Sequence, residues 1–254
     1  MLKTMYDNHN QNTLEWYRRR LGNITGSAVG NIMGKPKSKS DEWTATAQTY
    51  LNQIAFERAM NPLIVDNDDL FSQYVDLTSA RSKAIDWGHQ MEGEAAHLFA
   101  MSYIEDGTHY ELELEEPSSV KCEDLPHFAS SPDRVFYSPV TGEMCCIEIK
   151  CPQSAAFAKF VKNVFTLTDV GEQLEGLKKV DANYYWQCFA HMLATGASRT
   201  YFVVYNPFQL RPLNVIRIER DEAIISQLRE RIVAADKYVT QLTEELVREQ
   251  IKTA

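Results

Sequence analysis

Two stretches of the chain set its fold, SPD at residues 131–133 and IEIK at residues 147–150. Side chains two residues apart in a β-strand point to the same face, so Glu148 and Lys150 project together and the two isoleucines face the other side. A surface strand carrying an ion pair would show the same spacing. We expect a largely buried strand instead, because isoleucines bracket the charged residues and two cysteines precede them at 145 and 146.

A turn signal joins these two stretches. Thr141-Gly142 separates the strand that begins at Asp133 from the strand over 143–150, and would fold the second back beside the first as a hairpin. The carboxylates of Asp133 and Glu148 would then meet on one side. Two carboxylates beside one lysine form an oxygen-rich site that suits Mg²⁺. Such a site can activate water and offset the charge of a phosphate under attack, with Lys150 orienting or deprotonating the water.

Hydrophobic spacing divides the chain into a helical first part, an extended middle and a mixed last part. Helices are expected over residues 13–20, 27–33, 42–60, 79–103, 154–165, 182–195 and 222–252. Strands are expected over residues 110–114, 119–122, 127–130, 133–137, 143–150, 199–205 and 213–218. This order predicts a mixed α/β fold in which a central mixed β-sheet is flanked by helices.

The length and composition suit one compact unit. The chain has 254 residues, of which 44% are hydrophobic, and single cores stop growing at roughly 250–300 residues. We therefore expect a single domain over residues 1–254, with a core at about 16–207 and a C-terminal strand and long helix at 213–252.

The charge and the termini bound the setting in which the protein works. Its net charge of −9 argues by itself against nucleic-acid binding, because neutralising phosphates requires Lys and Arg. No run of about 18 apolar residues occurs, so no membrane span is expected. Residues 1–12 are polar and lack the apolar core of a secretory signal, so we expect a cytoplasmic protein.

The cysteines give no sign of a metal cluster. They form no CxxC pair and have no zinc-type spacing with histidine, so we expect reduced, structural thiols at Cys122, Cys145, Cys146, Cys151 and Cys188.

An acidic residue interrupts the apolar face of the helix expected over 79–103. The stripe at spacings of three and four reads Ile85, Gly88, Glu92, Ala95, Ala96 and Phe99. A buried, ionised Glu92 is costly unless it is paired or metal-bound, which favours a functional role. A side chain that reaches solvent from the edge of the stripe would fit the same pattern.

A glutamine lies at the margin of the apolar face of the helix expected over 182–195. Gln187 is flanked on that face by Tyr184 and His191. A core-facing amide needs a partner, which a water or lysine near the metal would supply. A surface glutamine explains the pattern equally well.

These residues occur within blocks that resemble a known family. The chain is similar to the phage-lambda-exonuclease-like, or YqaJ-type, viral recombinase nucleases of the PD-(D/E)xK superfamily, which have a restriction-endonuclease-like core. PD-(D/E)xK alone arises by chance, but the blocks occur here in the order of the family. They are WYRRRLGNITGS (16–27), WGHQME (87–92), SSPD (130–133), IEIKCP (147–152), YYWQ (184–187) and TYFVVYNP (200–207).

The resemblance implies a catalytic role for the central block. Asp133 and Glu148 would bind metal together with the backbone carbonyl of Ile149. The ions would be two Mg²⁺ per site, with Mn²⁺ able to substitute. Lys150 would serve the attacking water, and Glu92 would be a supporting acid near the metals.

The resemblance also implies that Gln187 helps to place the lysine or the water, and that the first block holds the DNA end. Arg20, Thr25 and Ser27 match family positions that grip the 5′-phosphate of the strand being degraded. A guanidinium with hydroxyl groups at the start of a helix is chemically suited to a phosphate.

The implied activity is that of a Mg²⁺-dependent double-stranded DNA exonuclease. It would degrade the 5′-ended strand processively to mononucleotides and leave a 3′ single strand for an annealing protein. The resemblance further implies a ring of three subunits around the duplex. A basic channel inside such a ring would reconcile DNA binding with a net charge of −9.

Other readings of the same residues lead to other functions. An endonuclease of this fold, as in restriction or repair, would have no use for an end-binding pocket at Arg20. An iron–sulfur nuclease needs cysteines downstream of the catalytic core, and none follows Cys188. A binding protein without catalysis would have lost an acid or the lysine, whereas Asp133, Glu148 and Lys150 are all present.

Overall fold

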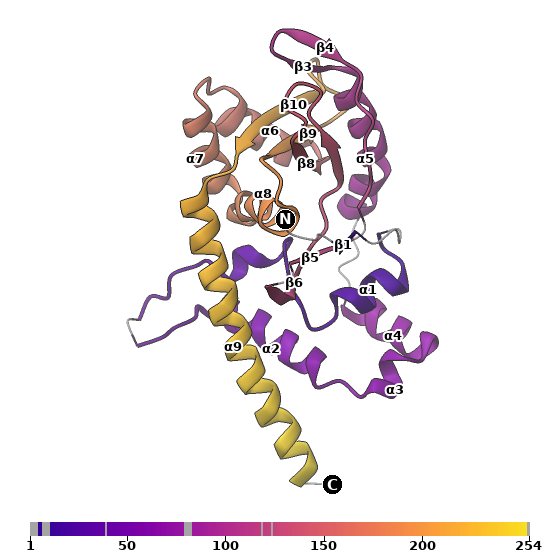
Figure 1. The fold of residues 1–254 in the computed structure, drawn as a ribbon, viewed down its shortest axis with the longest axis vertical. Coiled ribbons are helices and arrows are strands. Elements are labelled where there is room, and N and C mark those ends of the chain that lie inside the picture. Colours follow the sequence, from indigo (N-terminus) through magenta and orange to yellow (C-terminus); the bar gives the residue numbers. More distant parts are fainter. Residues whose placement is uncertain are drawn as a thin grey trace.

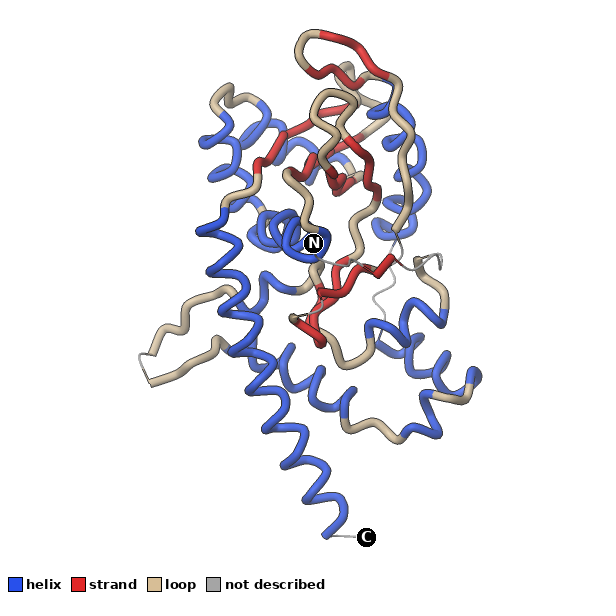
Figure 2. Tube along the Cα trace, viewed as in Figure 1, coloured by secondary structure: helices blue, strands red, loops and turns tan. Residues whose placement is uncertain are grey.

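The structure is a computed structural model that describes residues 5–6, 11–38, 40–78, 83–117, 119–122 and 124–252 (Figures 1 and 2). Its helices are α1 (Leu14–Arg20), η1 (Val29–Ile32), α2 (Ala45–Arg58), α3 (Pro62–Val65), α4 (Asp68–Thr78), α5 (Lys83–Met101), α6 (Ser154–Phe160), η2 (Val161–Phe165), α7 (Val170–Val180), α8 (Ala182–Thr195) and α9 (Glu222–Lys252). Its strands are β1 (Met5–Tyr6), β2 (Ile24–Thr25), β3 (Tyr103–Glu105), β4 (Thr108–Tyr110), β5 (Val120–Cys122), β6 (Leu125–Ser130), β7 (Arg134–Tyr137), β8 (Met144–Lys150), β9 (Arg199–Tyr205) and β10 (Leu213–Glu219).

The central sheet is mixed and has the strand order β10-β9-β8-β7. Strands β8 and β9 are parallel, and the other two pairings are antiparallel. A parallel pair needs a long crossover, which helices α6, η2, α7 and α8 supply here. The predicted central mixed sheet flanked by helices is confirmed.

The two faces of β8 pack against different helices, as the alternation of its residues predicts. Ile147 and Ile149 belong to a core cluster with Phe99 of α5. On the opposite face, Cys146 belongs to the larger core with residues of α8. Glu148 shares that face, and its carboxylate contacts His191 of α8.

The β7–β8 hairpin turns where the sequence indicated. Gly142 has a φ of 69°, a left-handed conformation that glycine adopts without steric cost. The pairing places Arg134 opposite Ile147, and the amide of Asp133 donates to the Ile147 carbonyl at 3.1 Å. Asp133 is therefore fixed beside the C-terminal end of β8 by the ladder itself.

A second sheet brings the N-terminal block to the same place. Its order is β1-β5-β6-β2, and β2 lies parallel to β6 with Thr25 opposite Ala129. The ladder continues through Gly26, whose amide donates to the Ala129 carbonyl at 2.9 Å. Residues 26 and 27 consequently lie next to the segment that leads into Asp133.

Several expectations about individual elements are wrong. The strand expected at 110–114 is absent, because only Tyr110 is paired, as the last residue of β4, and Glu115 forms an isolated bridge to Val135. The helix expected over 27–33 is a short 3₁₀ turn. The expected strands that do form are divided between two four-stranded sheets instead of one, with β5 and β6 in the first and β7, β8, β9 and β10 in the second.

Some elements had no counterpart in the sequence reading. Helices α3, α4 and α7 and the β3–β4 hairpin were not expected. The hairpin turns at Asp106-Gly107, with φ values of 50° and 75°. An Asp-Gly pair between short strands is a strong hairpin signal, so this element was predictable. The start of the helix expected over 79–103 lies partly outside the described residues, which resume at Lys83.

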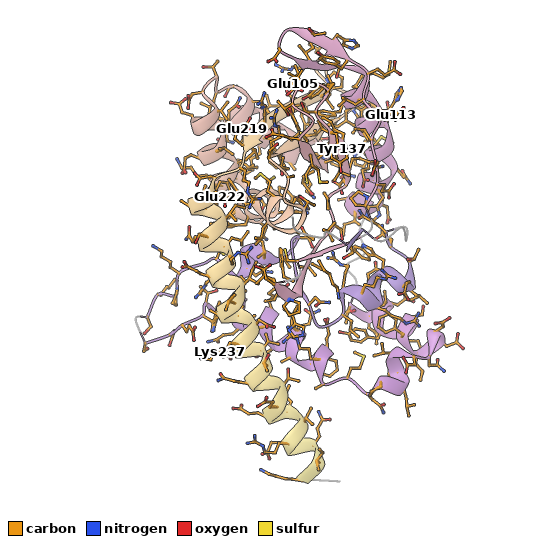
Figure 3. All side chains as sticks on the ribbon, viewed as in Figure 1. Glu105, Glu113, Tyr137, Glu219, Glu222 and Lys237 are labelled. Carbon is orange, nitrogen blue, oxygen red and sulfur yellow. The ribbon has the colours of Figure 1, made fainter. Side chains whose placement is uncertain are left out.

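Helix α9 closes the larger core along one edge. Its buried residues recur at spacings of three and four and are Ile225, Leu228, Ile232, Ala235 and Val239. Exposed charged side chains such as Glu222 and Lys237 line its outer side (Figure 3). In the described part of the chain, no helix is both long enough and apolar enough to cross a membrane.

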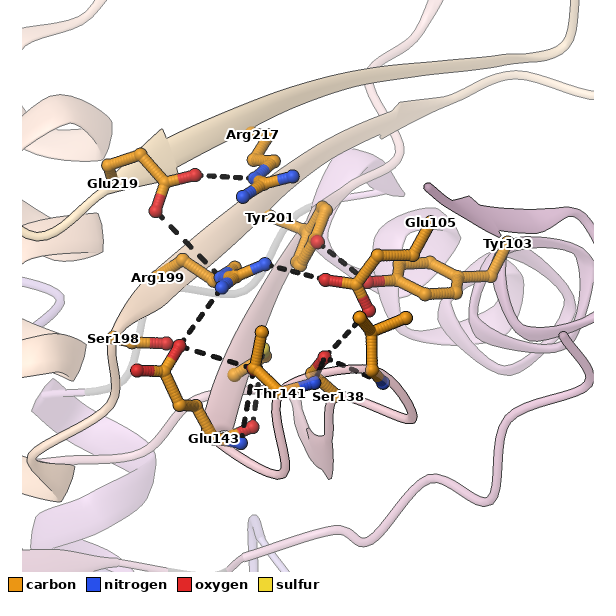
Figure 4. A network of polar contacts seen from close by, with 12 residues as sticks. Tyr103, Glu105, Ser138, Thr141, Glu143, Ser198, Arg199, Tyr201, Arg217 and Glu219 are labelled. Atoms are coloured by element: carbon orange, nitrogen blue, oxygen red, sulfur yellow. Dashed lines mark hydrogen bonds and ion pairs between the residues drawn. The ribbon is translucent and has the colours of Figure 1, made fainter. Parts of the chain in front are cut away.

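A buried arginine forms ion pairs at the end of the central sheet opposite to Lys150 (Figure 4). Arg199, at the start of β9, donates to Glu105 at 2.8 Å and to Glu143 at 3.0 Å. The side chains of Arg199 and Glu105 are only 5% and 4% exposed. Burial alone would raise the pKa of Glu105, but hydrogen bonds from Ser138 and the charge of Arg199 lower it overall.

Arg199→Ala should therefore destabilise the fold. Removing one partner leaves the carboxylate of Glu105 buried and unpaired, which costs about 3–5 kcal/mol in the free energy of unfolding. Urea denaturation followed by circular dichroism measures the loss. The matched control is Arg217→Ala, whose ion pair with Glu219 is about half exposed (48% and 56%) and is worth less than about 1 kcal/mol. Equal losses in the two variants would contradict the expectation.

Candidate active site

A cleft of about 830 Å³ opens at the C-terminal end of β8. It is lined by residues from α1, α5, β8, α6 and α8 and from the segment before β7. Every predicted site residue except Thr25 lies on its wall, namely Arg20, Ser27, Glu92, Asp133, Glu148, Ile149, Lys150 and Gln187. The fold thus brings together residues that are up to 167 positions apart in the sequence, from 20 to 187.

Two carboxylates of the cleft wall come from adjacent parts of the β7–β8 hairpin, Asp133 directly before β7 and Glu148 on β8. Asp133 accepts a hydrogen bond from the amide of Ile149 at 2.6 Å, through Oδ2. Burial, together with the negative charge of Glu148, raises the pKa of Asp133 well above its ordinary value. Glu148 is fully buried, yet Lys150 and His191 outweigh the effect of burial and lower its pKa. Glu148 therefore loses its proton at a lower pH than Asp133 does.

Lys150 lies between these acids and an aromatic ring. Its ammonium forms an ion pair with Oε1 of Glu148 and lies 4.7 Å from the centre of the Tyr184 ring. Burial disfavours the charged form, but Glu148 and Asp133 outweigh it and raise the pKa of Lys150 above its usual range. In this arrangement the lysine is a hydrogen-bond donor and a positive charge.

The oxygen atoms around Asp133 fit a hard cation. Ile147 accepts from the Asp133 amide, and alternation along β8 turns the main-chain groups of Ile149 to the same side. The Ile149 carbonyl could therefore serve, with the two carboxylates, as an oxygen ligand. Oε1 of Glu148 is buried and, among the described residues, has the ion pair with Lys150 but no hydrogen bond of normal geometry. Oxygen donors of this kind suit Mg²⁺.

A metal site formed by Asp133, Glu148 and Ile149 would need a main-chain oxygen as one of its ligands. In the part of the chain that the structure describes, no three His, Cys, Asp or Glu side chains converge on one point as a ready-made metal site. A cation bound here would compete with Lys150 for Glu148.

Glu92 lines the cleft from α5, and its charge is balanced by an ion pair with Arg134. Its side chain is 27% exposed, and Arg134 donates to its Oε1 at 2.9 Å. Arg134 directly follows Asp133 in the chain, and sequence reasoning did not single it out. Glu92 is therefore a paired acid at the wall of the cleft, near the carboxylates of Asp133 and Glu148.

Helix α8 supplies the buried polar groups on the Glu148 side. It begins at Asp181, whose side chain accepts from the amide of Asn183 at 2.9 Å, and ends before Gly196, which has a φ of 75°. Gln187 is only 6% exposed and lines the cleft, so it is not a surface glutamine. His191, one turn later on the same face, contacts Glu148 and was missed as a site residue.

The first block forms a pocket at one end of the cleft. Arg20, the last residue of α1, lies with its guanidinium 4.2 Å from the centre of the Trp16 ring. Its Nη2 donates to Ser27 Oγ at 3.0 Å, and its Nη1 donates to Ser131 Oγ at 3.4 Å. A cation held over an aromatic ring between two hydroxyl groups can receive an anionic oxygen.

The structure does not bring Thr25 to the wall of the cleft. Thr25 is buried on β2, and its amide donates to the hydroxyl of Tyr50 at 3.0 Å. Ser131 supplies a second hydroxyl next to Arg20 instead. It belongs to the SSPD block, so its place beside Asp133 was the available signal.

Comparisons with known proteins bear on the family and the fold of the chain. A family model described as the YqaJ-like viral recombinase domain matches residues 15–198. The crystal structure of an alkaline exonuclease (LHK-Exo) from Laribacter hongkongensis is similar, at 23% identity over 95% of this chain and 100% of that chain, with a TM-score of 0.68. The structure of LHK-Exo in complex with dAMP gives the same identity and coverage and a TM-score of 0.69.

A phage related exonuclease from Haemophilus somnus 129PT shares the fold at 20% identity, over 88% of this chain and 96% of that chain, with a TM-score of 0.58. No curated protein sequence matches the chain. The predicted family is nonetheless confirmed, because the family model spans most of the chain. The chain belongs to the YqaJ-like viral recombinase domain family.

Proposed function

We propose that the protein is a metal-dependent deoxyribonuclease, an exonuclease that works from the 5′-phosphorylated ends of duplex DNA. The observation that carries this proposal is one cleft that holds both the Arg20 pocket and the Asp133, Glu148 and Lys150 cluster. An internal cut needs only the cluster, whereas an end-directed cut needs both. The similar structures are those of an alkaline exonuclease and a phage related exonuclease, which supports the same class of reaction.

The catalytic cluster supplies the groups for phosphodiester hydrolysis. Asp133, Glu148 and the Ile149 carbonyl would hold Mg²⁺, or Mn²⁺ in its place, in a two-ion site. When bound, the metal activates water and neutralises charge on the scissile phosphate. Lys150 donates to the attacking water or to a phosphate oxygen and offsets the charge that develops there. Gln187, which is buried and lines the same cleft, would hold the orientation of these groups.

The Arg20 pocket determines where on the DNA the enzyme works. The terminal 5′-phosphate is bound by Arg20, Ser27 and Ser131. Thr25, on β2, supports the segment that contains Ser27. With the 5′ end fixed there, the next phosphodiester bond reaches the catalytic cluster, and each cut releases a mononucleotide. Degradation therefore runs 5′ to 3′ and leaves a 3′ single strand, the substrate of an annealing protein.

A ring explains how an acidic protein retains DNA. The net charge of −9 disfavours loose binding on the outer surface. Three copies of the chain around a duplex would hold the DNA in a central channel and make degradation processive. Each copy contributes residues 1–254 as one nuclease domain, and a core that runs from Ile24 to Val239 supports this unit. We place the enzyme in the cytoplasm, with its DNA.

Digestion of linear and covalently closed circular duplexes tests this proposal. With Mg²⁺, the linear duplex should be converted to mononucleotides while the circle survives, because a circle offers no 5′-phosphate to Arg20. EDTA should stop the reaction, and Mn²⁺ should restore it. Cutting of the circle at a similar rate would establish an endonuclease. Resistance of both substrates in every metal would instead support a DNA-binding protein without catalysis.

A further inference from the structure

A chain of buried hydrogen bonds supports Glu148 from behind. Nε2 of His191 lies 2.6 Å from Oε2 of Glu148, and Nδ1 of the same ring lies 2.8 Å from Oγ of Ser130. All three residues are completely buried. The histidine ring is therefore held at both nitrogens, and its direction is fixed by β6 on one side and β8 on the other.

The chemistry of the groups sets the direction of the first bond. An ionised carboxylate can only accept hydrogen bonds, so Nε2 of His191 carries a proton and donates it to Glu148. This bond engages Oε2. The other oxygen, Oε1, has only the ion pair with Lys150 among the described residues, and a cation in the cleft would compete with the lysine for it.

The second bond depends on a close approach that only glycine permits. A Cβ atom added to Gly26 would lie 2.1 Å from Oγ of Ser130. The missing side chain leaves room for the hydroxyl that holds His191. The next residue along the chain, Ser131, contacts Arg20 in the end-binding pocket. Of these two consecutive serines, Ser130 therefore contacts His191 behind Glu148, and Ser131 contacts Arg20.

We propose that His191 is a positioning residue, which holds Glu148 so that Oε1 is presented to the catalytic metal. The inference rests on the proposed metal-dependent function. Groups behind metal ligands orient them, and their removal costs about 10- to 100-fold in metal affinity or activity. His191 is not itself among the residues that line the cleft and contacts its wall through Glu148, so its removal should act on the metal rather than on the DNA.

Mn²⁺ binding, measured by calorimetry on the complete chain without DNA, tests this proposal. His191→Phe keeps an aromatic ring and removes the donor, and should raise the dissociation constant roughly 10- to 100-fold. His191→Gln retains an N–H near the position of Nε2 and should recover most of the affinity. Ser130→Ala frees the ring and should weaken binding by a smaller factor.

The outcomes separate the possible failures. If the wild-type protein binds no Mn²⁺, the proposed metal site is wrong. If the wild-type protein binds but folded His191→Phe binds equally well, His191 is structural and the positioning role is wrong. If His191→Phe does not fold, Ser130→Ala decides, and wild-type affinity in that variant overturns the proposal. The Mg²⁺ concentration for half-maximal cleavage should rise in parallel, with the KM for DNA unchanged.

Discussion

Lys150→Ala is expected to lower the rate of DNA cleavage by about 10²- to 10⁴-fold, the range typical of a group that assists proton transfer or stabilises the charge of the transition state. The ammonium of Lys150 is paired with Glu148 and lies against Tyr184, so it is held in place before the substrate arrives. Loss of this charge removes the cation that is paired with Glu148 in the proposed catalytic cluster. Single-turnover digestion of a linear duplex at saturating Mg²⁺ measures the effect.

Lys159→Ala is the matched control for this prediction. Lys159 lies on α6 and also lines the cleft. Its ammonium donates to the carbonyl of Val180 at 3.0 Å. Its removal should change the rate by less than about 10-fold, the equivalent of roughly 1.4 kcal/mol. Comparable losses in the two variants would mean that the cleft needs positive charge in general. A Lys150→Ala rate close to that of the wild type would remove the lysine from the mechanism.

Arg20→Ala is expected to remove the preference for a 5′-phosphate. The wild-type enzyme should digest a 5′-phosphorylated duplex roughly 10- to 100-fold faster than the same duplex with a 5′-hydroxyl, because hydrogen bonds to a charged group are worth about 1.5–3 kcal/mol. In the variant the two substrates should be digested at similar, low rates. Initial rates on paired substrates, at subsaturating DNA, measure the ratio.

Arg19→Ala is the control on the same helix. Arg19 pairs with Glu15 at 3.0 Å and does not line the cleft. That variant should keep the wild-type ratio between the two substrates. An Arg20→Ala enzyme that still prefers the phosphate would place the end-binding site elsewhere.

The strand that carries Glu148 and Lys150 was predictable because its information is local. Period-two alternation fixes which side chains share a face, and Ile147 and Ile149 do pack on the opposite side from Glu148. The hairpin through Gly142 was predictable for the same reason, since the turn chemistry lies within a few residues.

Contacts between distant segments were not accessible in this way. Arg134 reaches Glu92 across 42 positions, and His191 reaches Glu148 across 43. Neither pair leaves a periodic trace in the sequence, because each depends on how a helix is docked against the sheet. Thr25 shows the converse case: it belongs to a matching block, yet it is buried on β2 with its amide bonded to Tyr50 and is not among the residues that line the cleft.

The fate of a single labelled strand tests the central claim most directly. A linear duplex with 5′-phosphates would carry one label at the 5′ end of a strand and a different label at the 3′ end of the same strand. With Mg²⁺, the 5′ label should be released first, as a mononucleotide, while the 3′ label stays in a long strand until late in the reaction. Early release of the 3′ label, or the appearance of internal fragments that carry either label, would contradict an exonuclease guided by the Arg20 pocket.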